Sequence, residues 1–134
     1  MVASHEHALL TMKQARLDLS SARILIDTNP VGAFMLTYDA ARKALTAILA
    51  NQGLRPMGSE GGHAVLLDVV FAQLDPPLGD DLREFDWMRR LRNDSAYPSP
   101  DRKVASATDV EDALPAASRI IEIAATVIEQ MPVY

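Results

Sequence analysis

Apolar side chains recur along most of the chain at the three- and four-residue spacing that is typical of amphipathic helices. No segment alternates apolar and polar residues over the length of a strand, so the pattern predicts no sheet. Turn residues divide the pattern into five helices, expected over residues 4–27, 30–52, 63–74, 79–97 and 108–128. We therefore expect an all-α fold, an antiparallel up-down bundle of four long helices plus one short helix, in a single domain over residues 1–134.

Local capping signals define several of these helix ends. Ser4 is a candidate cap for the first helix and Asn29 for the second, where Pro30 suits the first helical position. Thr108 and Glu111 have the spacing of a capping box, in which two side chains bind each other's backbone amides. The last helix is therefore expected to begin at Thr108.

Three helices carry more apolar surface than one small bundle needs. The first has one apolar stripe of Leu9, Met12, Leu19 and Ile26 and a second of Leu10, Leu17 and Ile24. The helix at 63–74 has almost no polar face, and the last helix has a heptad stripe of Val110, Leu114, Ala117, Ile121, Ala124 and Ile128. Pro115 lies past the first turn of that helix, so we expect a kink there. The excess apolar surface predicts a homodimer.

Composition narrows the functional classes. A formal net charge of −5 argues against a general nucleic-acid coat protein and leaves room only for a local cationic patch. The absence of cysteine excludes disulfides, thiolate nucleophiles and cysteine-based zinc sites. No apolar run reaches the roughly 20 residues of a membrane helix, and the N-terminal residues do not resemble a signal peptide. We expect a cytoplasmic protein without a membrane segment or a cofactor.

Residues 87–98 concentrate aromatic, cationic and amide side chains within a dozen positions. Because a proline disfavours helical geometry in the residue before it, Pro98 places these groups on the last turns of a helix. Helical spacing brings together Arg89, Arg90, Arg92, Asn93 and Tyr97. Guanidinium groups suit phosphate or carboxylate, so the three arginines are candidate phosphate-binding residues. The structural alternative is a helix end whose dipole the arginines offset while Tyr97 braces a corner.

Three segments of the sequence resemble the motifs of one known protein family. They are Tyr38-Asp39-Ala40-Ala41-Arg42-Lys43-Ala44-Leu45, then Gly53-Leu54-Arg55-Pro56 followed by Gly61-Gly62-His63, and last Arg92-Asn93 with Tyr97-Pro98. Together they resemble the HEPN superfamily over most of residues 8–130. Its members are antiparallel helical bundles with an Arg, usually Arg-Asn, followed four to six residues later by His.

The resemblance implies a mechanism for active members. Two chains pair so that two signatures face one cleft, and they cut RNA without a metal, with His as general acid or base and Arg on the phosphate. Carried over, Arg92 is the phosphate-binding Arg, Asn93 is its polar neighbour, and Tyr97 stands where the family has His. A phenol with a pKa near 10 keeps its proton at neutral pH, whereas an imidazole exchanges one. Losing acid–base catalysis typically lowers the rate about 10²–10⁴-fold, so we expect weak or lost ribonuclease activity.

The histidines and acidic residues offer further candidates. His63 is a possible substitute base if it approaches Arg92 across the bundle; otherwise it is a helix-start residue that packs its ring or binds a carbonyl. His5 and His7 form at most a two-ligand metal clip, which is a weak site. The acidic residues between positions 80 and 86 are typical of a solvated helix start rather than a magnesium site. We therefore predict no metal centre.

Three functions compete for these residues. The first is a HEPN-like domain that binds RNA or nucleotide phosphate in a toxin–antitoxin or defence context, with a nucleotidyltransferase-type antitoxin as cognate partner. The second is an active metal-independent endoribonuclease that uses Tyr97 or His63. The third is a non-catalytic dimeric interaction module in which residues 87–98 only brace the fold. Binding that depends on Arg92 indicates the first, and cleavage that survives EDTA indicates the second.

Overall fold

The structure is a computed structural model that describes residues 2–51 and 79–130. Four helices make up most of these two ranges: α1 (Val2–Leu25), α2 (Pro30–Asn51), α4 (Gly79–Ala96) and α5 (Ala107–Gln130). The described residues contain no strand, so the predicted all-α class is confirmed. The short helix expected over residues 63–74 lies outside the described ranges.

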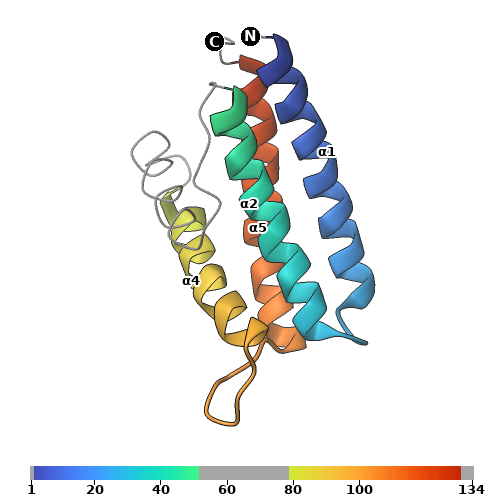
Figure 1. Ribbon diagram of the computed structural model, residues 1–134, viewed down its shortest axis with the longest axis vertical. Coiled ribbons are helices and arrows are strands. Elements are labelled where there is room, and N and C mark those ends of the chain that lie inside the picture. Colours follow the sequence, from blue (N-terminus) through green and yellow to red (C-terminus); the bar gives the residue numbers. More distant parts are fainter. Residues whose placement is uncertain (1, 52–78, 131–134) are drawn as a thin grey trace.

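The central helix of the described bundle is α2, which packs against α1, α4 and α5 (Figure 1). The C-terminal helix α5 also touches α1 and α4, whereas α1 and α4 share no contact. In Figure 1, α1 and α4 accordingly lie on opposite sides of α2. A feature on the outer face of α1 is therefore remote from a feature on α4.

The turn between α1 and α2 follows the predicted capping chemistry. The amides of Thr28 and Asn29 donate to the Leu25 carbonyl at 3.1 and 2.8 Å, which closes the end of α1. The Asn29 Oδ1 atom accepts from the Gly32 amide at 3.0 Å, and Pro30 is the first residue of α2. The prediction of Asn29 as a cap is thus confirmed. Ser4 is not a cap, because α1 already begins at Val2 and Ala3 is a strong helix former.

The start of α5 differs from the predicted capping box. Ser106 is the cap: its Oγ accepts from the Asp109 amide at 3.2 Å, and Asp109 Oδ2 accepts from the Ser106 amide at 3.0 Å. This is the reciprocal pattern of a capping box, placed two residues before the predicted pair of Thr108 and Glu111. The preceding amide, of Ala105, donates to Ser95 Oγ at 2.9 Å, which ties the connection to the end of α4.

The core is built from one buried face of each helix, and α1 contributes mainly small side chains. Its buried apolar residues are Ala8, Met12, Ala15, Leu19 and Ala22. Alanines allow close approach of neighbouring helices, because the interaxial distance depends on the side chains at the contact. The predicted stripe of α5 is buried or half-buried along its length. Pro115 lies inside α5 on its exposed side, and the helix continues through it.

A buried ion pair joins α1 to α2. Lys43 Nζ of α2 donates to Asp18 Oδ2 of α1, and Gln14 Nε2 donates to Asp18 Oδ1 at 3.0 Å. The Asp18 side chain is 9% exposed and that of Lys43 26% exposed. Both oxygens of a nearly buried carboxylate are therefore bonded, as a desolvated charge requires.

Candidate functional site

The candidate site begins with an aromatic contact between α2 and α4. The ring of Tyr38, buried on α2, stacks on Phe85 of α4 with centroids 5.1 Å apart and ring planes 13° apart. One turn earlier on α2, Phe34 meets the edge of Trp87 at 5.7 Å. These contacts bury large apolar areas, and they fix the rotation of α4 relative to α2. The polar side chains near the end of α4 therefore have a defined position over α2.

Arg92 lies above the Tyr38 ring, with its guanidinium carbon 6.0 Å from the ring centroid. This is a cation–π contact, and the Arg92 side chain is half-buried. Its Nη1 donates weakly to Asn93 Oδ1 at 3.4 Å, while its buried Nε has no hydrogen-bond acceptor within the described residues. No carboxylate of residues 2–51 or 79–130 forms an ion pair with Arg92. This guanidinium is held by an aromatic ring rather than neutralised.

Arg89 and Arg90 have a different environment, because they share the carboxylate of Asp86. Arg89 Nη2 lies 3.1 Å from Asp86 Oδ1, and Arg90 Nη2 lies 3.2 Å from Asp86 Oδ2. An incoming anion must compete with Asp86 for both of these arginines. The spacing of three and four residues from Asp86 is visible in the sequence and is the signal that identifies these pairs.

Arg42 of α2 joins the same cluster, although sequence reasoning did not include it among the site residues. Burial raises the pKa of Tyr38 to about 12, and the charges of Arg42, Arg92 and Arg89 oppose that rise. Arg42 therefore lies close enough to influence the phenol from the α2 side. Its own carboxylate contact is long, with Nε 3.8 Å from Asp39 Oδ1. Its place four residues after Tyr38, on one helix face, is the sequence signal for this position.

Tyr97 lies just beyond the helix that carries Asn93, so helical spacing does not relate the two side chains. Helix α4 ends at Ala96, so Tyr97 is the first residue beyond it, and its side chain is 71% exposed. Asn93 is half-buried beside Arg92. The phenol of Tyr97 thus faces solvent at the end of the helix that carries the arginines.

A comparison with family models places this site in a known domain. The model described as the HEPN domain matches residues 8–128, which include all of the site residues above. The chain belongs to the HEPN family. A search of curated proteins found no match.

Histidines are remote from Arg92 within the described part of this HEPN domain. His5 and His7 lie on α1, which does not contact α4. His63, the predicted substitute base, lies outside the described residues. No group of three or more His, Asp or Glu side chains in the described ranges is arranged to hold a metal ion.

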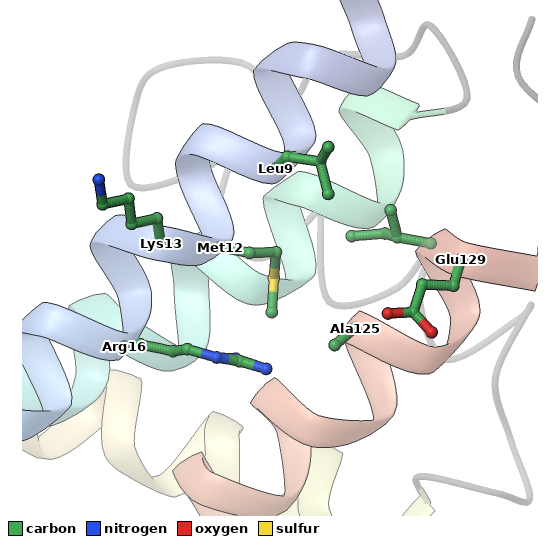
Figure 2. A pocket seen from close by; sticks show the side chains of 7 residues that line it. Leu9, Met12, Lys13, Arg16, Ala125 and Glu129 are labelled. Atoms are coloured by element: carbon green, nitrogen blue, oxygen red, sulfur yellow. The ribbon is translucent and has the colours of Figure 1, made fainter.

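Two surface hollows of the HEPN domain lie apart from Arg92. One, of about 520 Å³, is lined by Glu84, Trp87 and Asp112 between α4 and α5. The other is a groove of about 280 Å³ between α1 and α5, lined by Leu9, Met12, Lys13, Arg16, Ala125, Ile128 and Glu129 (Figure 2).

Among the described helices, none has the length and apolar character needed to span a membrane.

Proposed function

We propose that this HEPN domain binds RNA or a nucleotide through a phosphate group, with Arg92 as the principal ligand and Arg42 beside it. The observation that carries the proposal is the state of Arg92, a half-buried guanidinium on the Tyr38 ring with no carboxylate partner among the described residues. A planar guanidinium with free donors suits the bidentate recognition of phosphate. Arg89 and Arg90 add further positive charge, which the carboxylate of Asp86 partly neutralises.

In this proposal the domain has weak or lost ribonuclease activity. Tyr97 takes the place of the family's histidine, and a phenol is a poor proton acceptor at neutral pH. The Tyr38 phenol, with its pKa raised to about 12, is also protonated at neutral pH and therefore does not serve as a general base there. Asn93, next to Arg92, supplies a further polar group for the bound phosphate.

The setting that we propose is a toxin–antitoxin or defence system, in which a nucleotidyltransferase-type antitoxin is the cognate partner. The whole chain, residues 1–134, would form one antiparallel bundle in which a short helix at 63–74 joins the four long ones. Two such domains would pair as a homodimer. Family membership supports these proposals, because a metal-independent, RNA-directed dimer is what the resemblance to HEPN proteins implies.

The test is the affinity of a short fluorescent single-stranded RNA, measured by anisotropy for the wild type and two matched variants. Arg92→Ala removes the proposed ligand. Arg83→Ala removes the same charge from the start of α4, where Arg83 binds Asp80 in an exposed pair. A charged hydrogen bond contributes about 1.5–3 kcal/mol, so Arg92→Ala should weaken binding about 10- to 100-fold. Equal affinities for Arg92→Ala and Arg83→Ala would contradict the proposal.

The exposure of Tyr97 favours a second candidate function, an active metal-independent endoribonuclease. Its phenol lies at the open end of α4, where it is accessible to a bound RNA backbone. This function predicts RNA cleavage that persists in EDTA and falls with Tyr97→Phe, which keeps the ring and removes the hydroxyl. Cleavage that is unaffected by Tyr97→Phe, or absent from concentrated pure protein, rejects this role for Tyr97.

A further inference from the structure

Charged side chains of two helices act on the buried phenol of Tyr38. Burial raises the pKa of this phenol to about 12, whereas the positive charges of Arg42, Arg92 and Arg89 act to lower it. The carboxylate of Asp39 acts in the opposite direction. Because salt screens exposed charges over distances of about 8–10 Å, these four side chains all lie near one position between α2 and α4. We call Arg42, Arg89 and Arg92 the arginine cluster.

The packing of α2 against α4 brings the arginine cluster together. The guanidinium carbon of Arg92 lies 6.0 Å from the centroid of the Tyr38 ring, which stacks on Phe85 of α4. Arg89 precedes Arg92 by three residues, so the two share a face of α4. Arg42 follows Tyr38 by four residues and shares its face of α2. Aromatic packing between the two helices therefore fixes the position of the cluster.

The arginine cluster is only partly neutralised within the described residues. Asp86 divides its carboxylate between Arg89, at 3.1 Å, and the exposed arginine that follows it. The ion pair of Arg42 with Asp39 is long, at 3.8 Å, and Arg92 has no ion pair. Counting the exposed neighbour, four guanidinium groups share two carboxylates. Two positive charges at this position are therefore left without a partner among the described residues.

We propose that the arginine cluster selects a dianionic phosphate, the terminal phosphomonoester of a nucleotide or of an RNA end, over an internal phosphodiester. This inference rests on the proposed function, because it concerns the same phosphate site. A phosphomonoester carries a charge of about −1.5 to −2 at pH 7, whereas a phosphodiester carries a single negative charge. A dianion therefore matches the two unpartnered positive charges, and a diester leaves one of them unmatched.

The burial of the arginine cluster also favours the end of a chain. The side chains of Arg42 and Arg89 are 29% and 21% exposed, and Arg92 is half-buried. The neighbouring Arg90, by contrast, is 65% exposed. An internal phosphodiester carries a nucleoside on each side, and both must fit beside a recessed charge. A terminal phosphate carries only one.

The test is competition for the fluorescent RNA of the Arg92 experiment by adenosine 5′-monophosphate and by its methyl phosphodiester. The methyl group blocks one phosphate oxygen and removes one negative charge, and the nucleoside stays the same. At about pH 7.5 we expect the monophosphate to bind about 10-fold more tightly, the gain of one more charged hydrogen bond. At about pH 5, below the second phosphate pKa near 6, the difference should shrink to about twofold.

The same comparison with RNA separates the two sources of a terminal phosphate. One RNA sequence is measured with a 5′-phosphate and with a 5′-hydroxyl. A preference for the phosphorylated RNA supports the proposal with an RNA end as ligand, and a preference confined to the mononucleotides supports it with a free nucleotide as ligand. The described helices α2, α4 and α5 contain no histidine, and the pH series with the methyl diester measures any titration of the protein itself.

Two variants test whether the preference comes from the cluster. Arg42→Gln removes one of its charges and should bring the monophosphate close to the methyl diester in affinity. Arg83→Ala removes a charge from an exposed pair at the start of α4 and should keep the full preference. Circular dichroism shows that both variants are folded.

The outcomes separate this inference from the proposed function. Equal affinities within both ligand pairs, with RNA binding that still depends on Arg92, would overturn the inference and leave the proposed function standing. A preference that is unchanged at about pH 5, or that Arg42→Gln leaves intact, would also overturn it, because the second phosphate charge would not be its cause. Failure of the RNA and of both nucleotides to bind would remove the inference together with the proposed function.

Discussion

The buried pair of Asp18 and Lys43 provides a prediction whose size follows from the structure. Asp18→Ala removes a carboxylate that is 9% exposed and leaves the Lys43 ammonium, 26% exposed, without its partner. Breaking a fully buried pair costs about 3–5 kcal/mol, because the remaining charge stays desolvated. The partial exposure of Lys43 places the expected loss at the lower end, about 3 kcal/mol. For a chain of this length, that loss lowers the melting temperature by about 10 °C.

The assay is thermal and urea unfolding followed by circular dichroism, with two comparison variants. Arg83→Ala breaks an exposed pair with Asp80 and should leave the melting temperature unchanged, because exposed pairs contribute little. Asp18→Leu combined with Lys43→Met replaces the pair with apolar groups and should recover most of the stability. If Asp18→Ala melts as Arg83→Ala does, or if the double apolar variant is no better than Asp18→Ala, the reasoning from desolvation is wrong.

Three further predictions concern the cap of α5 and the buried phenol. Ser106→Ala should cost about 1 kcal/mol in urea unfolding, whereas Thr108→Ala should change little. Burial acts to raise the pKa of Asp109, but its bonds to Ser106 and the charge of Lys103 outweigh burial and lower it. Ionised Asp109 therefore stabilises the folded state at pH values above its ordinary pKa, and this stabilisation is lost as the pH falls below that value. Ser106→Ala should make this pH-dependent loss of stability smaller. For Tyr38, whose pKa is about 12, stability should fall between about pH 10 and 12, and Tyr38→Phe should remove that fall.

The parts of the fold that the sequence predicted correctly depend on short-range signals. Asn29 followed by Pro30 carries its capping chemistry within three residues, so the start of α2 was predictable. Apolar periodicity likewise gave the buried stripe of α5. The cap of α5 was misplaced because Ser106 and Thr108 both precede an acidic residue by three positions. The chain uses Ser106 as the cap, and the residue before it is held by a tertiary hydrogen bond from the Ala105 amide to Ser95 Oγ. The spacing of residues 106–111 does not show that bond.

In the candidate site, too, short-range features were predictable from the sequence, whereas contacts between helices were not. The sequence located the cationic segment at the end of α4, and the helical spacing of Asp86 from Arg89 and Arg90 is a signal for those two ion pairs. It did not indicate that Arg92 lies on an aromatic ring, because that contact depends on the packing of α4 against Tyr38 of α2. A contact between helices so far apart in the chain has no signature in the spacing of either one.

The central claim is that Arg92 binds a phosphate, and the arginine Nε–H resonances in an NMR titration with a nucleoside monophosphate test it most directly. The Nε of Arg92 is buried without an acceptor in the described residues, so its resonance should report a new anion at the guanidinium. We predict a saturable shift of the Arg92 resonance, assigned by its loss in Arg92→Lys, with no shift for Arg83. An unchanged Arg92 resonance at saturating nucleotide, or an equal shift of Arg83, would contradict the account.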